Sequence, residues 1–121
     1  MSVAAAQASA FYEQVARAKS VYTFTVDGDF LVFPVHGQEV VPFWSSRSRV
    51  DKVQQDHPKY SAYAVSEIPM SEFLGTVLSR LKDEQINIGV NWSGSRLTGY
   101  DIAPDDVHRN IEHWLGRLTE G

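Results

Sequence analysis

The stretch from Val40 to Arg49 (VVPFWSSRSR) constrains the fold more than any other part of the sequence. Val40 to Trp44 is apolar apart from its proline and rich in β-branched and aromatic residues, which favours a buried strand. The two serines that follow are typical helix caps, and a polar helix carrying Val50 and Val53 continues from them. A strand that passes directly into a helix predicts a domain in which helices pack on a sheet.

The segments before this junction read as one helix followed by strands. The alanine-rich start favours a helix, and the apolar, β-branched runs after it favour strands separated by turns at 27–29 and 36–38. Three such strands in succession predict an antiparallel meander. The expected elements are a helix at 4–19 and strands at 21–26, 30–33 and 40–44.

After the junction, helices and strands alternate. The strand at 86–92 alternates strictly, so Ile86, Ile88, Val90 and Trp92 are expected to face the core, and Asn87, Gly89 and Asn91 to face away. Pro104 suits the first position of the last helix, where its missing N–H does no harm. The expected elements are helices at 46–55 and at about 70–84, strands at 63–68 and 86–92, a short edge strand at 97–102 and a last helix from 104.

The element order predicts an α+β fold. We expect a mixed sheet of five or six strands, built from an antiparallel meander plus two β-α-β crossovers, with about four helices packed on it. The 121 residues suit a single domain, 1–121, in which residues 1–7 are expected to fray.

Composition narrows the class of protein. A net charge of −4 and scattered basic residues argue against a nucleic-acid binder or a membrane-surface protein. The chain has no cysteine, which excludes disulfides and thiolate chemistry and suits a reducing compartment. No apolar stretch approaches the roughly 20 residues that span a bilayer. We therefore expect a cytoplasmic protein.

Metal and cofactor sites are not expected. His108 and His113 fall five residues apart on the last predicted helix, so their rings would point about 140° apart and could not share one ion. No glycine-rich phosphate loop is present, and no nucleophile elbow surrounds a serine. The sequence predicts no metal, no cofactor and no catalytic residues.

The junction offers one candidate ligand site, made of Ser45, Ser46, Arg47 and Arg49. A helix start exposes unpaired N–H groups, and two arginines in its first turn oppose the helix dipole, a cost that a bound anion would relieve. The alternative is that the serines only cap the helix and the arginines point into solvent or pair with acids such as Asp51.

Trp44 and Trp92 suggest a second kind of site. Tryptophan is enriched where one protein binds another, so these two rings could form an interaction surface. Packing at the edge of the core is the alternative. An exposed sheet edge could also pair with a partner, giving a homodimer instead of a monomer.

Four segments together resemble a known family. They are VPFWS at 41–45, MSEFL at 70–74, IGVNW at 88–92 and APDDV at 103–107. Their order and spacing resemble the bacterial family catalogued as domain of unknown function 2750, over residues 8–118. The resemblance implies a small stand-alone bacterial protein with no assigned activity and no catalytic residues to carry over.

These observations favour a non-enzymatic accessory or protein-interaction module. The first alternative is a small-anion or metabolite-binding protein that uses the helix start at Ser45–Arg49. A third reading is a serine hydrolase that assembles Ser45 or Ser46 with a distant histidine.

Overall fold

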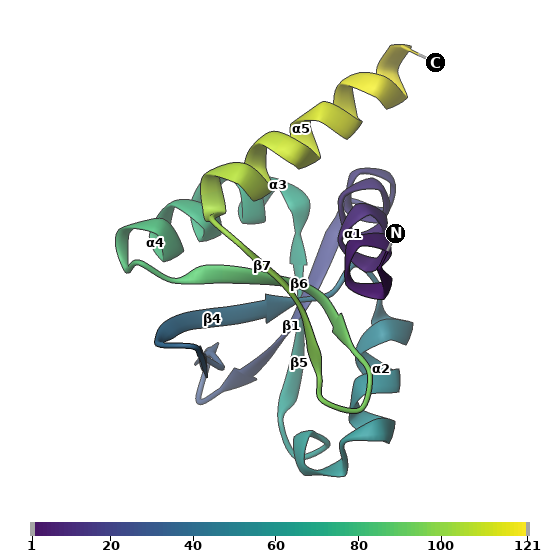
Figure 1. Ribbon diagram of the computed structural model, residues 1–121. Helices are drawn as coiled ribbons and strands as arrows, with labels where there is room; N and C mark the ends of the chain where they lie inside the picture. The colour runs from purple at the N-terminus through teal and green to yellow at the C-terminus, as the bar shows by residue number, and fades with distance from the viewer. Residues whose placement is uncertain (1, 121) are drawn as a thin grey trace.

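Two small sheets meet at the centre of the chain, with helices on their outer sides, in the computed structural model, which describes residues 2–120 (Figure 1). One sheet has three antiparallel strands in the order β2-β1-β5. The other has four strands in the order β3-β4-β6-β7, of which β4 and β6 run parallel. The strands are β1 (Ser20–Val26), β2 (Asp29–Phe30), β3 (Phe33–Val35), β4 (Gln38–Phe43), β5 (Ala64–Pro69), β6 (Asn87–Ser93) and β7 (Thr98–Ile102).

The α+β class is confirmed, but the strands form two sheets with seven strands between them instead of one sheet of five or six. The predicted meander divides after β2. Phe30 packs with one core and Phe33 with the other, so the apolar run at 30–33 crosses between them. β1 and β4 do not pair as a ladder: one backbone bridge joins Tyr22 to Trp44, just after β4, and the Thr23 hydroxyl donates to the carbonyl oxygen of Pro42 at 2.7 Å.

The predicted pair of crossovers is also different. In the sequence, β5 comes after β4 and before β6. It nevertheless lies in the three-stranded sheet, whereas β4 and β6 lie in the four-stranded sheet. The one parallel connection therefore runs from β4 to β6, and it includes α2, β5 and the following helical segment. Because β5 pairs with β1, this single crossover joins the two sheets.

The first helix, α1 (Val3–Ala18), has a side-chain cap. The Ser2 hydroxyl accepts the backbone N–H of Ala5 at 3.1 Å. Of the residues expected to fray, 3–7 are helical, and Met1 lies outside the described residues. The helix ends at Lys19, whose φ of 66° is left-handed and turns the chain into β1.

The remaining helices lie close to the predicted ranges. The segment after β5 is helical throughout, with a wider π turn in its middle that includes Gly75. Among the described residues, no helix is both long and apolar enough to cross a membrane. The elements are α2 (Arg47–Asp56), the 3₁₀ turn η1 (Pro58–Tyr60), α3 (Met70–Glu72), the π turn η2 (Phe73–Val77), α4 (Leu78–Asp83) and α5 (Pro104–Glu120).

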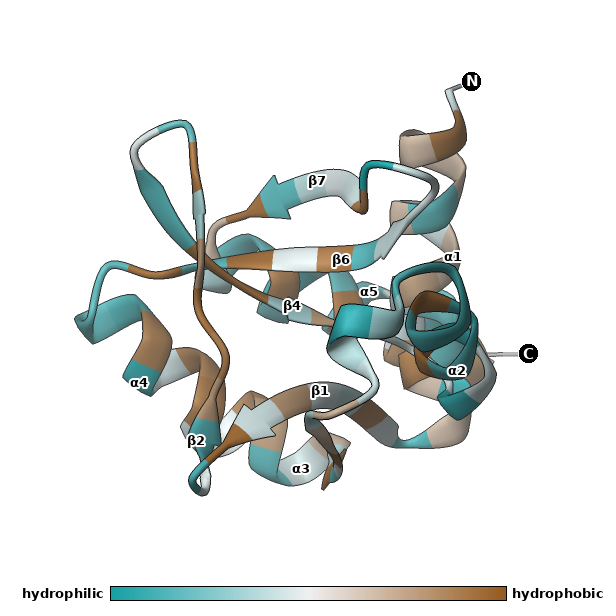
Figure 2. Cartoon of the chain, turned by 90° about the horizontal axis from the view of Figure 1, so that it is seen from below, coloured by the Kyte–Doolittle hydropathy of each residue, from teal (hydrophilic) through white to brown (hydrophobic). Residues whose placement is uncertain are grey.

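The four-stranded sheet is covered on both faces, so it separates two hydrophobic cores. Along β1 and β6, apolar residues alternate with paler or hydrophilic ones, whereas α2 shows much hydrophilic surface (Figure 2). The first core lies under α1, α4 and α5 and includes Phe11, Val15, Phe43, Phe73, Ile88, Val90 and Ile111. The second lies under α2 and includes Phe24, Val40, Trp44, Val50, Val53, Trp92 and Leu97.

Candidate functional site

The junction between β4 and α2 has the predicted order of strand, cap and helix. Trp44 and Tyr22 exchange two backbone hydrogen bonds of 2.8 Å, which tie the end of β4 to β1. Two residues later, the Ser46 hydroxyl accepts the backbone N–H of Arg49 at 3.3 Å and caps α2. The start of α2 is therefore anchored to both sheets.

Ser45 is enclosed by protein, with 1% of its surface exposed. Its backbone N–H donates to Asn91 Oδ1 at 2.9 Å, and its hydroxyl accepts from Asn91 Nδ2 at 3.0 Å. The same hydroxyl donates to Gln14 Oε1. Asn91 Nδ2 also donates to the backbone oxygen of Gln7 at 3.2 Å. Ser45 thus connects α1 and β6 to the junction, and these contacts occupy its hydroxyl.

Asn91 reaches Ser45 because the chain is bulged at this point of β6. Its φ is +51°, in the left-handed region that asparagine tolerates better than most residues. The pairing of β6 with β7 shifts register between Val90 and Ser93. Asn91 was expected to face away from the core, but it is 1% exposed, and Trp92 turns to the face opposite Val90.

Arg49 is held differently from a surface arginine. Its Nε donates to Gln14 Oε1 at 3.1 Å, and one terminal nitrogen donates to Gln7 Oε1, so two side chains of α1 fix the guanidinium. None of the salt bridges formed by the described residues includes Arg49. Partial burial lowers the pKa of Arg49 from its ordinary value, although arginine stays charged in proteins. A half-buried cation is therefore held by neutral partners.

A cavity of about 350 Å³ lies beside this cation. It is bounded by the inner side of α2, the end of β6 and the start of α1. Lys52 and Asp56 also line it and pair with each other at 3.0 Å, so Arg49 is the lining cation that lacks an acidic partner among residues 2–120. The lining residues are Gln7, Trp44, Ser48, Arg49, Lys52, Val53, Asp56, His57, Asn91, Trp92, Ser93 and Gly94.

The structure brings only part of the predicted ligand site to this cavity. Arg49 lines it, whereas Arg47 points away, is exposed and pairs with Asp51 at 3.2 Å. Ser46 is used as the helix cap, and Ser45 is occupied by Asn91. The alternative expectation, that the serines cap the helix and that an arginine pairs with Asp51, describes Ser46 and Arg47 but not Ser45, which bonds to Asn91 and Gln14 instead.

The two tryptophans of the predicted interaction surface lie inside the protein. Trp44 is 0% and Trp92 4% exposed. Their indole N–H groups are both used internally, by the carbonyl of Trp92 at 2.8 Å and by Asp101 at 2.9 Å. A docking surface needs exposed rings, so these two side chains belong to the second core, as the alternative expectation held.

Histidines are not gathered at the cavity. Only His57 lines it, where its Nε2 lies 2.9 Å from the carbonyl oxygen of Gly94. Within residues 2–120, no three histidine, aspartate or glutamate side chains are grouped so that they could hold a metal ion.

Sequence reasoning missed the three amide side chains that build this site. Gln7 and Gln14 are seven residues apart in α1, which places them on one side of the helix. This spacing is a usable signal, and Asn91 within an apolar strand is another. Neither signal shows that the three amides meet Ser45 and Arg49, because those contacts span 31 to 46 residues along the chain.

Comparison with protein-family models identifies a family. The model of the family described as "Protein of unknown function (DUF2750)" matches residues 8–111. Among curated proteins, none matches the chain.

Proposed function

Because the chain belongs to the DUF2750 family, whose function is unknown, we propose its function from its own geometry: it binds a small anionic ligand in the cavity beside α2. Arg49 carries this proposal. A guanidinium has five N–H donors, and the two glutamines accept two of them. The remaining donors suit a carboxylate or phosphate, which guanidinium groups bind through two parallel hydrogen bonds.

The surroundings of Arg49 support a bound ligand over a purely structural arginine. An arginine that only stabilises a fold is normally paired with an acid or extended into water, and Arg49 is neither. The cavity volume falls within the range of small-molecule sites. Trp92 and Val53 give it an apolar wall, which would exclude water from the ion pair and strengthen it.

The same geometry supports binding without a chemical step. The serine hydrolase reading needs a histidine beside Ser45 or Ser46. The hydroxyl of Ser45 contacts the amides of Gln14 and Asn91, and that of Ser46 contacts Ser48 and a backbone N–H. A non-enzymatic role therefore stays the expectation.

An accessory protein that docks on a partner is the other candidate. Such docking would need a surface other than the Trp44 and Trp92 rings, which are buried. The edge strand β7, where Tyr100 is 44% exposed, is the described edge that best suits strand pairing with a partner or a second copy. Arg49 has no role in that alternative.

Titration with inorganic phosphate and with adenosine monophosphate, followed through backbone amide NMR signals, tests the proposal. Signals of residues 48–53 and 91–94 should shift. Thermal unfolding should also show stabilisation of about 2.7 kcal/mol at a hundred times the dissociation constant.

Two arginine variants make the test specific. Arg49→Ala should abolish the shifts. Arg47→Ala removes an equal charge two positions before Arg49 in α2 but outside the cavity, and should leave the shifts unchanged. Equal losses in both variants would indicate unspecific attraction of anions. Unmoved amides at millimolar ligand would exclude the proposed site.

A further inference from the structure

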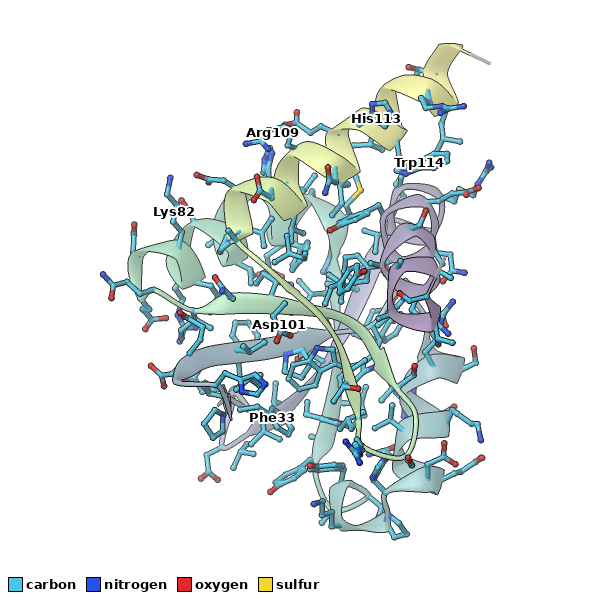
Figure 3. The ribbon with its side chains drawn as sticks, in the orientation of Figure 1. Phe33, Lys82, Asp101, Arg109, His113 and Trp114 are labelled. Carbon is cyan, nitrogen blue, oxygen red and sulfur yellow. The ribbon has the colours of Figure 1, made fainter. Side chains whose placement is uncertain are left out.

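A second cavity, of about 390 Å³, lies on the side of the four-stranded sheet that carries the second core. It is bounded by the β3–β4 hairpin on one side and by β7 on the other. Phe33 and Asp101 come from the two outer strands of the sheet and both line it (Figure 3). It shares only Trp92 with the cavity beside α2, so the two sites can be tested separately.

The Trp92 ring that lines this second cavity is held in one position by glycines. A Cβ atom on Gly99 would lie 2.8 Å from Cδ1 of the ring, and one on Gly89 would collide with its Nε1. Only residues without a side chain leave room for the indole to lie flat over β6 and β7. The ring meets Phe33 in a T-shaped arrangement, with an angle of 79° between the ring planes and 5.4 Å between the centroids.

This arrangement directs the indole N–H at a carboxylate. Trp92 Nε1 donates to Asp101 Oδ1 at 2.9 Å. The part of the chain that the structure describes provides no lysine, arginine or histidine within salt-bridge distance of Asp101. Burial raises the pKa of Asp101, and the Trp92 hydrogen bond and the nearby His36 lower it by less. Among residues 2–120, the carboxylate therefore has one neutral donor and no salt-bridge partner.

The exposed rim of the cavity carries basic side chains, in contrast to the Asp101 carboxylate. Arg96 and His36 line it, and both are exposed. The lining also includes the apolar side chains of Phe33, Val35 and Leu97. The cavity thus offers one carboxylate, apolar side chains and two basic side chains.

We propose that this cavity binds a small zwitterion, with a free amino acid that has an apolar side chain as the simplest case. The ligand's ammonium group donates to Asp101, and its apolar part lies against Phe33 and Leu97. Its carboxylate faces Arg96 and His36. No bond is formed or broken, and each charge of the ligand meets one of opposite sign.

Calorimetry and amide NMR with L-phenylalanine test this proposal. Signals from Phe33, Trp92 and Asp101 should shift during the titration to about 10 mM, ten times a dissociation constant of 1 mM. Phenethylamine, which lacks the carboxylate, and 3-phenylpropanoate, which lacks the ammonium group, should each bind about tenfold more weakly or worse. If either analogue binds as tightly as phenylalanine, the ligand need not be a zwitterion and the proposal is overturned. The absence of shifts with phenylalanine also overturns it.

Variants connect the binding to the named groups. Asp101→Asn keeps an acceptor for Trp92 and removes the charge, so phenylalanine affinity should fall about tenfold or more. Arg96→Gln, at an exposed position that is tolerant of change, should weaken the amino acid but not phenethylamine. Binding unaltered in both variants overturns the proposal. As a control, Asp105→Asn, which removes an exposed carboxylate on α5, should leave phenylalanine binding unchanged.

Discussion

The indole N–H of Trp44 donates a 2.8 Å hydrogen bond to the backbone carbonyl oxygen of Trp92. This bond joins the end of β4 to the bulged end of β6, next to the hydrogen bonds between Ser45 and Asn91. It therefore helps to position both cavities, since Trp92 lines each of them.

Trp44→Phe tests how much this bond contributes. The change removes the donor of a buried hydrogen bond and leaves a small void, so we expect the free energy of unfolding to fall by about 2–4 kcal/mol. Urea denaturation followed by far-UV circular dichroism measures it. Trp114→Phe, at a partly buried ring on α5, is the control and should cost less than half as much. Equal losses would mean that ring volume, and not the hydrogen bond, dominates.

Substitutions at Asn91 separate its side-chain contacts from its backbone conformation. Asn91→Ala loses the hydrogen bonds to Ser45 and Gln7 and keeps the left-handed φ of +51°, so we expect a loss of about 3 kcal/mol in unfolding free energy. Asn91→Gly loses the same contacts but adopts positive φ freely, and should be about 1 kcal/mol more stable than Asn91→Ala. Equal stability of the two variants would show that the bulge stores no strain.

Asn91 also shows which feature of this fold could not be predicted from the sequence. The strand at 86–92 was recognised from its alternation, and Ile88 and Val90 do lie in the first core. A prediction from alternation assumes that successive residues point to opposite faces of the sheet. The bulge at Asn91 interrupts this alternation, so Trp92 lies on the face opposite Val90. A left-handed residue inside a strand is fixed by the tertiary contacts of its side chain, which a local pattern does not contain.

The division into two sheets was missed for a related reason. Turn residues at 27–29 and 36–38 did predict the hairpins, and both form. They do not specify whether consecutive hairpins continue one sheet. Whether one sheet continues depends on which side chains of the run at 30–33 face each core. Because all four residues are apolar, the sequence does not distinguish between the two cores at this point. At the site, Arg49 was identified because it is local to a helix start, whereas its partners Gln7 and Gln14 lie 42 and 35 residues away.

Gln14→Glu places an internal anion beside Arg49. The glutamine oxygen accepts bonds from Arg49 and Ser45, so a carboxylate can replace it without losing either donor. We expect a gain of about 1 kcal/mol in unfolding free energy at neutral pH and roughly tenfold weaker phosphate binding, because the new ion pair competes with the ligand. Glu13→Gln, which removes an exposed salt bridge to Arg17 next to this position, should change neither quantity measurably. Phosphate binding that is unaffected by Gln14→Glu would place the anion elsewhere.

Glycine substitutions test how tightly the Trp92 ring is held. Gly99→Ala introduces a Cβ atom 2.8 Å from the ring, and displacing a packed indole should cost about 1–3 kcal/mol and alter the near-UV circular dichroism of tryptophan. The control is Gly116→Ala in α5, where a Cβ atom meets nothing within 4 Å. That change should raise the free energy of unfolding by about 0.5–1 kcal/mol, since alanine favours helix. A stabilising Gly99→Ala would mean that the ring moves freely.

The pH dependence of stability should have opposite signs at Asp101 and Asp105. Burial raises the pKa of Asp101 in the folded protein, so its protonated form favours folding. This contribution is present in full below the pKa of the unfolded chain and is lost as pH rises through the folded-state pKa. Asp101→Asn, which is uncharged at every pH, should therefore be more stable than the unaltered protein at pH 7, with a difference that shrinks on acidification.

At Asp105, the hydrogen bond from Lys82 lowers the pKa, so the ionised form favours folding. Its contribution is present above the unfolded-state pKa and is lost as pH falls through the folded-state value. Asp105→Asn should accordingly be less stable than the unaltered protein at pH 7, and this difference should also disappear in acid. Urea midpoints measured from pH 7 into the acid range compare the two variants directly. If Asp101→Asn is destabilised at pH 7 like Asp105→Asn, then the hydrogen bond from Trp92 outweighs burial at Asp101, and the carboxylate needs no ligand as a counter-ion.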